Sequence, residues 1–392
     1  MSSSDTTGAE SLALHAKHRG KIAVQPKVPL DNRHDYSLAY SPGVAAVALA
    51  CAANPAETNR LTVRGNSVAV ISDGSAVLGL GNIGPAGAFP VMEGKAALFK
   101  ALAGIDAWPL VLASQDVAQT IATVRNLAPS FAGINLEDFK APECFAIEEA
   151  LQDLGIPVMH DDQHGTAIVV LAGLTNALTV VNKEKESVRI IVNGAGAAGI
   201  AVTKLLLADG YACGNIILCD TKGAIYAGRA DLGDSKKAEL AQITNATCMS
   251  GDLSSVLVNA DVFIGLSKPN LLHRTDIATM AKDAIVFALA NPVPEIFPAE
   301  AHAGGARIIA TGRSDLPNQV NNSLAFPGVF RGAIDCGATR ITTEMKLAAA
   351  HELARIVTEP TAESILPFAT EKRVVPAVAA AVASAWNART PD

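Results

Sequence analysis

The sequence predicts a two-domain α/β protein built on parallel sheets. Its 392 residues exceed what one ordinary core holds, because domains contain about 150 residues on average. Short apolar segments alternate with helical segments across short connections, which is typical of parallel βα units. We place the boundary near residue 163, which gives an N-terminal α/β domain of residues 1–163 and a second domain of residues 164–392 with a parallel sheet.

The composition excludes several classes of protein. Hydrophobic residues make up 49% and charged residues 18%, which rules out a disordered or fibrous chain. Lys and Arg number 31 against 38 Asp and Glu, and both signs are scattered, so nothing indicates nucleic-acid binding. The longest apolar stretches, Thr166–Val181 and Val374–Trp386, are shorter than the roughly 18 residues that a membrane span needs. We therefore expect buried helices there and no membrane contact.

The N-terminus and the cysteines predict a cytoplasmic protein. The first ten residues, MSSSDTTGAE, lack the basic and apolar regions of a signal peptide. The six cysteines form no CxxC pair, and such thiols are most simply buried small residues of a reduced protein.

In the first domain, a polar helical segment is expected to about residue 35, followed by a break at Tyr40-Ser-Pro-Gly43. A glycine-rich turn, Gly79–Pro90, precedes a helix that carries Lys95. The expected strands are Ser67–Ser72, Trp108–Leu112, Gly133–Leu136 and Pro157–His160, and the other expected helices are Val44–Ala53, Gln115–Leu127 and Cys144–Leu154.

In the second domain, a long apolar helix is expected at Gly165–Asn182. The expected strands are Val188–Val192, Ile216–Cys219, Val262–Ile264, Ile285–Ala288 and Arg307–Ala310. Two C-terminal helices, Thr343–Val357 and Pro376–Ala388, are expected to pack back on the first domain.

The sequence Gly194-Ala195-Gly196-Ala197-Ala198-Gly199 lies between an expected strand and an expected helix, and Asp220 ends the next strand 21 positions later. In this context the motif predicts a dinucleotide site: the first glycine permits a tight turn, the second lets a pyrophosphate approach, and the third permits close packing of helix on strand. The alternative to a dinucleotide site is a glycine-rich turn that binds no ligand. Asp220 slightly favours NAD, because a carboxylate accepts the ribose 2′-hydroxyl and repels a 2′-phosphate, but Lys222 can neutralise that phosphate and admit NADP.

Two acidic pairs, Glu137-Asp138 and Asp161-Asp162, each follow a short strand. Carboxyl ends of parallel strands meet at one edge of the sheet, so four carboxylates can gather there. Such oxygen ligands suit Mg²⁺ or Mn²⁺. The alternative is that these acids simply belong to surface turns.

Three further sequence features each allow two interpretations. Lys95 lies on a largely apolar helix, where it either extends its ammonium to solvent or serves as a base with a lowered pKa. Tyr40 is either a packing aromatic at a turn or a functional group. The amides of Leu289-Ala-Asn-Pro292 and of residues 317–322 either form turns or bond a carboxylate or a nicotinamide.

Taken in order, several blocks resemble the malic enzymes, most closely their short bacterial and archaeal form. The likeness spans roughly residues 12 to 340. The blocks are Tyr40-Ser-Pro-Gly-Val-Ala45, Leu78-Gly-Leu-Gly-Asn-Ile-Gly84 through Glu93-Gly-Lys95, Glu137-Asp-Phe139, His160-Asp-Asp-Gln-His-Gly-Thr166, the dinucleotide motif, Ala290-Asn-Pro292 and Asn318-Gln-Val-Asn-Asn-Ser-Leu-Ala-Phe-Pro-Gly328.

This resemblance implies oxidative decarboxylation of L-malate to pyruvate and CO₂, with NAD or NADP and with Mg²⁺ or Mn²⁺. Lys95 would be the general base on the C2 hydroxyl, with Asp161 near it, and Tyr40 the acid that protonates enolpyruvate at C3. A homodimer or larger homo-oligomer is expected. The metal ligands would be Glu137, Asp138 and Asp162, and the substrate and nicotinamide contacts Asn291, Asn321 and Asn322.

One position departs from the longer members of the family. Where those carry an arginine that binds the malate carboxylate, this chain has Ala76, as in the short form. Arg313 is a weak candidate for the missing cation.

Two rival functions are open. One is a malolactic-type reaction or simple oxaloacetate decarboxylation at the same site. The other is a non-catalytic dinucleotide-binding sensor, which would require a gap in the set of catalytic residues.

Overall fold

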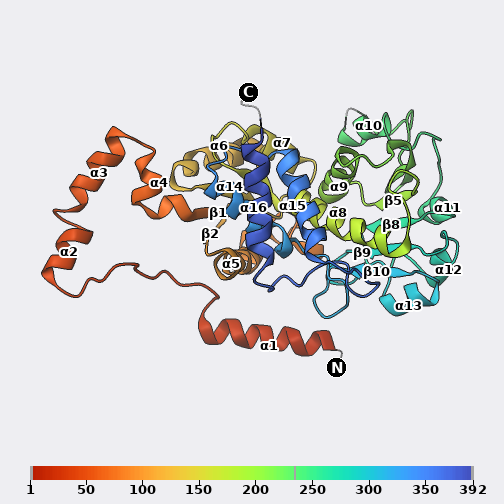
Figure 1. Ribbon diagram of the computed structural model, residues 1–392, viewed down its shortest axis with the longest axis horizontal. Coiled ribbons are helices and arrows are strands. Elements are labelled where there is room, and N and C mark those ends of the chain that lie inside the picture. Colours follow the sequence, from red (N-terminus) through yellow and green to blue (C-terminus); the bar gives the residue numbers. More distant parts are fainter. Residues whose placement is uncertain (1–2, 234, 390–392) are drawn as a thin grey trace.

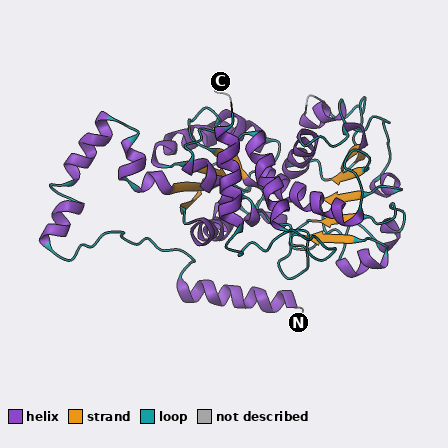
Figure 2. Cartoon of the chain, in the orientation of Figure 1, coloured by secondary structure: helices purple, strands orange, loops and turns teal. Residues whose placement is uncertain are grey.

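The computed structural model describes residues 3–233 and 235–389, which form two α/β halves and an extended N-terminal segment (Figures 1 and 2). The first half holds a four-stranded parallel sheet with the order β2-β1-β3-β4. Its strands are β1 (Ser67–Ser72), β2 (Asp106–Val111), β3 (Gly133–Leu136) and β4 (Val158–His160), and its helices are α5 (Gly84–Ala103), α6 (Val117–Leu127) and α7 (Glu143–Ala150).

The second half holds a six-stranded sheet with the order β10-β9-β8-β5-β6-β7. Five strands are parallel, and the two-residue β7 pairs antiparallel with β6 at the edge. The predicted α/β class and parallel sheets are therefore confirmed, with β7 as the one antiparallel addition. The strands are β5 (Ile190–Asn193), β6 (Ile216–Asp220), β7 (Gly223–Ala224), β8 (Val262–Gly265), β9 (Ile285–Ala288) and β10 (Ile308–Thr311), and the helices are α8 (Asp161–Val181), α9 (Ala197–Ala208), α10 (Lys236–Ala241), α11 (Leu253–Leu257), α12 (Arg274–Ile277), α13 (Pro298–Ala303), α14 (Phe326–Asp335), α15 (Thr343–Ile356) and α16 (Val374–Asn387).

Helix α8 joins the two halves and is mostly buried. It begins directly at the end of β4 and packs against α9 and α15. Its apolar residues belong to a core cluster that also contains Val68 of β1 and Val192 of β5. The helix ends at Asn182, which adopts the left-handed conformation that commonly terminates helices. The functional residues at its first turn are thus held on a rigid element.

The C-terminal helices return to the first half. Phe326 and Phe330 of α14 contact Phe99 of α5, with ring centroids 4.7 Å and 5.4 Å apart. Helix α16 packs on α14 and α15. Side chains at Gly328 and Gly332 would collide with α16, so these glycines permit the close approach of the two helices.

The N-terminal arm, residues 3–61, stands away from the body (Figure 1). It consists of α1 (Ser3–His18), α2 (Arg33–Ala39), α3 (Val44–Ala53) and α4 (Glu57–Leu61). The expected single helical segment to about residue 35 is wrong, because the helix ends at His18 and residues 19–32 form neither helix nor strand. The arm touches the body where Lys21 N–H donates to Glu93 (2.9 Å) and where Lys27 pairs with Asp106 (2.7 Å).

The arm exposes apolar side chains that a monomer in water would bury. No residue of α2, α3 or α4 is buried, and Val24, Leu38, Tyr40 and Leu49 are each more than half exposed. Exposed apolar side chains, where they join into one surface, usually mark an interaction site.

Two segments have the length and hydropathy of a membrane span, Arg33–Ala53 and Asp161–Val181. The second is α8, most of which is buried inside the protein. The first is divided into α2 and α3 by the turn at residues 40–43. The cysteines are all free thiols, but Cys213 and Cys248 are exposed, so the expectation that all six are buried is wrong.

Candidate active site

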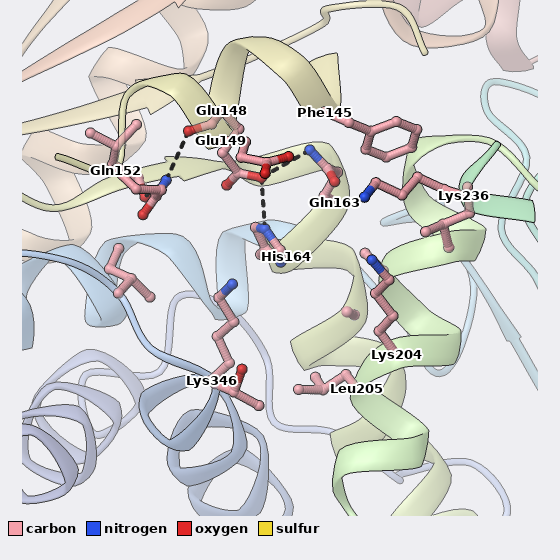
Figure 3. A pocket seen from close by; sticks show the side chains of 16 residues that line it. Phe145, Glu148, Glu149, Gln152, Gln163, His164, Lys204, Leu205, Lys236 and Lys346 are labelled. Carbon is pink, nitrogen blue, oxygen red and sulfur yellow. Dashed lines mark hydrogen bonds and ion pairs between the residues drawn. The ribbon is translucent and has the colours of Figure 1, made fainter. Parts of the chain in front are cut away.

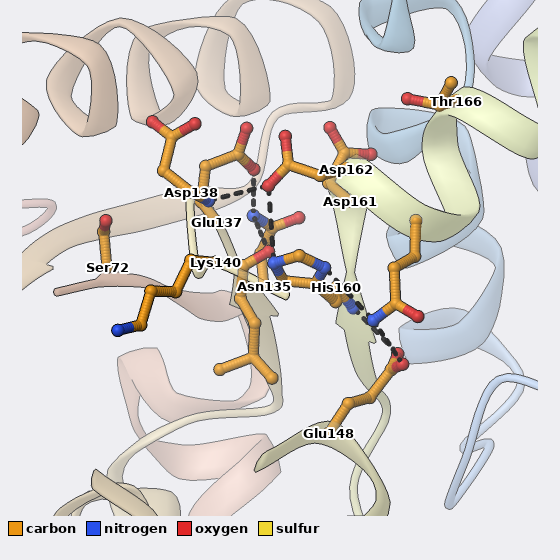
Figure 4. Close-up of polar contacts among 12 residues, drawn as sticks. Ser72, Asn135, Glu137, Asp138, Lys140, Glu148, His160, Asp161, Asp162 and Thr166 are labelled. Atoms are coloured by element: carbon orange, nitrogen blue, oxygen red, sulfur yellow. Dashed lines mark hydrogen bonds and ion pairs between the residues drawn. The ribbon is translucent and has the colours of Figure 1, made fainter. Parts of the chain in front are cut away.

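Four carboxylates gather at the carboxyl edge of the first sheet (Figure 4). Glu137 and Asp138 follow β3, and Asp161 and Asp162 form the first turn of α8 directly after β4. Glu137, Asp138 and Asp162 each offer a carboxylate oxygen, and these atoms lie within 4.8 Å of one another. The parallel register of β3 and β4 places the two acidic pairs side by side.

The backbone helps to hold this cluster. Asp138 has φ 58°, a left-handed conformation that costs free energy for a residue with a side chain. Its N–H donates to Asp162 Oδ2 at 2.7 Å, and Asn135 Nδ2 donates to Glu137 Oε2 at 2.9 Å. The carboxylate oxygens that could hold a cation are therefore positioned by the fold.

Lys95 of α5 lies between two of the acids. Its Nζ is 2.5 Å from Asp161 Oδ2 and 2.8 Å from Glu137 Oε1, and it lies 4.4 Å from the ring centroid of Phe326. Burial alone would lower the pKa of Lys95, but Asp161 and Glu137 raise it above its usual value. The expectation that Lys95 extends its ammonium to solvent is therefore wrong, because the side chain is mostly buried and ion-paired. Its role as a base stays a prediction.

The charge balance of this site fits a divalent cation. Four buried or half-buried carboxylates face one lysine, so negative charge is in excess. Burial raises the pKa of Glu137 most, and the neighbouring Asp162, Asp161 and Asp138 raise it further. Clustered carboxylate oxygens are the ligands that Mg²⁺ and Mn²⁺ prefer.

The second half of the chain supplies one side of the same site. Asn322 lies in the short 3₁₀ helix Asn322–Leu324, and its Nδ2 donates to Asp161 Oδ2 at 3.1 Å. Its Oδ1 accepts from Thr166 Oγ1 at 3.1 Å. Gly165 makes room for this arrangement, because a Cβ there would lie 1.9 Å from Asp161 Oδ1.

A second layer of polar groups lies behind the carboxylates, and sequence reasoning missed it. Glu148 of α7 accepts from the His160 N–H (2.9 Å), from Gln163 Nε2 (3.1 Å) and pairs with His164 Nε2 (3.0 Å). His160 Nε2 in turn lies 3.3 Å from Asp162 Oδ2. Burial would raise the pKa of Glu148, but His164, Lys346 and His160 together hold it at about 2. Only the position of the two histidines in the motif could have signalled this network.

The other residues expected to contact the substrate or the nicotinamide, two asparagines and one arginine, lie in different parts of the structure. The backbone oxygen of Asn291 comes so close to Gly79 that a Cβ there would lie 1.9 Å from it, so Asn291 adjoins the glycine-rich turn of the first half. Asn321 caps the short 3₁₀ helix instead, since its Oδ1 accepts from Ser323 N–H at 2.9 Å. Arg313 pairs with Asp315 at 2.7 Å.

Tyr40 is not at this site within one chain. It follows α2 on the N-terminal arm and is 62% exposed, whereas Lys95 lies on α5. Figure 1 shows α2 well away from α5. Its aromatic neighbour is Tyr36 of the same arm.

The glycines of the dinucleotide motif have the geometry that such a site requires. Gly194 has φ 114°, and a Cβ there would lie 2.5 Å from the Leu266 oxygen. A Cβ at Gly199 would lie 1.8 Å from the Gly194 oxygen, whereas Gly196 faces open space. Since Gly196 also precedes the first turn of α9, the free N–H groups of that turn face the side where a pyrophosphate would bind.

Asp220, at the end of β6, is surrounded by cations. Arg229 donates to both of its oxygens (3.0 Å and 2.5 Å), and Lys237 Nζ lies 3.1 Å from Oδ2. Burial alone would raise the pKa of Asp220, but Arg229, the Lys222 N–H and Lys237 hold it at about 2. The ammonium of Lys222 pairs with Asp231 instead (2.9 Å). Arg229 and Lys237 were not foreseen from the sequence.

Family models agree with this arrangement over most of the chain. Residues 19–152 match the malic enzyme N-terminal domain, and residues 163–386 match the malic enzyme NAD-binding domain. The chain belongs to the malic enzyme family. The predicted resemblance is thereby confirmed.

Individual family members are similar over nearly the whole chain. A bifunctional malic/malolactic enzyme of Bacillus subtilis is 52% identical, covering 96% of this chain and 92% of its own. An NADP-dependent malic enzyme of Escherichia coli is 50% identical over 86% of this chain and 44% of its own. The crystal structure of an NAD-dependent malic enzyme of Thermotoga maritima superposes with a TM-score of 0.91 at 49% identity, covering 95% of this chain and 98% of that one.

Proposed function

We propose that this protein oxidises L-malate and decarboxylates it to pyruvate and CO₂, using NAD or NADP and a divalent cation. The observation that carries the proposal is Lys95, held between Asp161 and Glu137 beside the three clustered carboxylates. A dinucleotide-binding sensor without chemistry would have no need of a buried lysine and four acids, since burying such charges costs several kcal/mol per ion.

The residues divide the work as follows. Glu137, Asp138 and Asp162 would hold Mg²⁺ or Mn²⁺. When bound, the nicotinamide accepts a hydride from C2 and the cation acts as a Lewis acid on the C2 oxygen. While holding the cation, Glu137 would attract Lys95 less strongly, which would lower the pKa of Lys95 and let it accept the proton of the C2 hydroxyl. Asp161 and Asn322 position Lys95 and the substrate.

We propose that the second proton transfer uses Tyr40 of a partner subunit. Tyr40 lies on an exposed apolar arm, whereas Lys95 of the same chain lies on α5 in the body. In a homodimer with exchanged arms, that apolar surface would be buried and Tyr40 would reach the site of the neighbouring chain. A tyrosine is protonated at neutral pH and can donate to C3 of the enol after CO₂ has left.

Cofactor choice depends on the cluster around Asp220. Its carboxylate still favours the 2′-hydroxyl of NAD slightly. Arg229 and Lys237 supply two cations beside it, which compensate a 2′-phosphate and would allow NADP as well. We therefore propose that both dinucleotides are accepted.

A second candidate, a malolactic reaction that releases lactate, is favoured by the likeness to the B. subtilis enzyme, whose name includes this activity. Both candidates are tested by incubating the protein with L-malate, Mn²⁺ and either dinucleotide and then measuring pyruvate, lactate and reduced dinucleotide. Equal amounts of pyruvate and reduced dinucleotide are expected. Lactate formed without net reduction would favour the malolactic reaction.

A further inference from the structure

A second polar cavity lies behind the candidate active site, on the other side of helix α8. It has a volume of about 300 Å³ and lies between α7, α8, α9, α15 and the start of α10 (Figure 3). Gln163, His164 and Ala167 of α8 line it, whereas Asp161 of the same helix pairs with Lys95 and Gly165 faces Asp161. Because successive residues of a helix point about 100° apart, these two sets lie on different faces of α8.

Three lysines from three elements converge on this cavity. Lys204 comes from α9, Lys236 from α10 and Lys346 from α15. In Figure 3 the side chains of Lys204 and Lys346 rise toward Gln163 and His164, and that of Lys236 approaches from the far side. Cations brought together from separate helices repel one another, so the arrangement is more stable with an anion between them.

The cations are poorly compensated within the cavity. Among the described residues, neither Lys204 nor Lys346 forms a side-chain ion pair or hydrogen bond, and Lys236 pairs only with Glu239 of its own helix (3.1 Å). Burial lowers the pKa of Lys346, against the attraction of Glu148 and Glu344. Burial and Lys346 also lower the pKa of His164, against the attraction of Glu148.

The acids that line the cavity do not replace the missing anion. Glu148 already receives hydrogen bonds from Gln163 and the His160 N–H and pairs with His164. Glu149 is exposed to solvent. An anion that neutralised the three lysines would therefore come from outside the chain.

The lining indicates which kind of anion fits. It contains three lysines, and a lysine ammonium is a point charge that commonly binds phosphoryl groups. Phe145, Ile200, Leu205 and Ile341 supply apolar surface for a short carbon skeleton. The volume is at the lower limit of small-molecule sites and too small for a dinucleotide.

We propose that this cavity binds a small phosphate ester, with its phosphoryl group facing Lys204, Lys236 and Lys346. The site is separate from the dinucleotide motif, since the glycines and Asp220 do not line it. The proposal concerns binding alone and does not depend on which reaction the enzyme catalyses.

Calorimetric titration of the full-length protein with glycerol 3-phosphate tests the proposal, with chelator present and without malate or dinucleotide. We expect saturable binding to the wild type, weaker binding of inorganic phosphate at the same site and none of glycerol. Lys346→Met and Lys204→Gln should each weaken binding by about tenfold or more, because each removes a charged hydrogen-bond donor. Lys372→Gln, at an exposed lysine outside the cavity, is the matched control and should bind as the wild type does.

Three results would overturn the proposal. They are no saturable binding to the wild type, equal binding in the lysine variants, and loss of binding in Lys237→Gln instead, which would place the phosphate beside Asp220. Lys204 is exposed, so Lys204→Gln keeps the test valid even where Lys346→Met unfolds.

Discussion

Two acidic sites at the carboxyl ends of parallel strands have opposite charge balances. At the first sheet, four carboxylates face a single lysine, and burial, followed by the neighbouring acids, raises the pKa of Glu137. At the second sheet, Asp220 stands alone between Arg229 and Lys237, and its pKa falls to about 2. The first site needs a cation to be stable, whereas the second can accept an additional anion. The number of acids at a strand end therefore says less about function than the cations that surround them.

The largest effect of a substitution is expected at Lys95. Lys95→Ala removes the base and leaves Asp161 and Glu137 without their ion pair, so kcat with L-malate should fall by about 10²–10⁴-fold. Single-turnover formation of reduced dinucleotide measures the step. Lys100→Ala changes an exposed lysine of the same helix and should keep normal activity. If Lys95→Ala still formed reduced dinucleotide in a single-turnover burst at the normal rate, Lys95 would not be the base.

Tyr40→Phe should have the next largest effect, on a different step. Only the hydroxyl is lost, so the burst of reduced dinucleotide should survive while protonation at C3 slows, by up to about 10²-fold. Exchange of tritium into pyruvate at C3 reports this step. Tyr36→Phe, at the neighbouring ring of the arm, is the control, and complete loss of the burst in Tyr40→Phe would reverse the assignment.

Glu148→Gln tests whether the layer behind the carboxylates supports them. The substitution weakens the groups that hold His160 against Asp162, so Mn²⁺ affinity should fall by about tenfold, as is usual for groups that orient metal ligands. Calorimetry measures the affinity directly. Glu149→Gln alters the adjacent exposed acid and should leave the Mn²⁺ affinity unchanged. Equal Mn²⁺ affinities in the wild type and both variants would show that this layer does not support the metal site.

An effect of similar size is expected at the second acidic site. Lys237→Gln removes a cation beside Asp220, so kcat/KM with NADP should fall by about tenfold relative to NAD, roughly 1.4 kcal/mol. Lys222→Gln serves as the comparison, since the Lys222 ammonium pairs with Asp231. A larger loss in Lys222→Gln would show that this lysine, and not Lys237, meets the 2′-phosphate.

The sequence predicts the first site well, because its parts are local. Glu137-Asp138 and Asp161-Asp162 each adjoin a strand end, and parallel pairing brings strand ends together. The same holds for the glycine motif, whose turn, strand and helix are consecutive. Several strands, such as Ser67–Ser72 and Gly133–Leu136, have the predicted bounds for the same reason.

What the sequence could not predict depends on distant contacts. Arg229 and Lys237 contact Asp220 from positions 9 and 17 residues later in the sequence, and no local sequence pattern predicts these contacts. The raised pKa of Lys95 follows from two carboxylates on other elements. The exposed arm that carries Tyr40 also escaped prediction, because helical periodicity does not say what a helix packs against.

The central claim is that turnover requires a cation bound by Glu137, Asp138 and Asp162. Its most direct test is to titrate chelator-treated protein with Mn²⁺ while recording bound metal and reduced dinucleotide formed from L-malate. The account predicts no turnover without metal, recovery in proportion to one bound Mn²⁺ per chain, and loss of both in Asp162→Asn. Full turnover of the metal-free protein would contradict it.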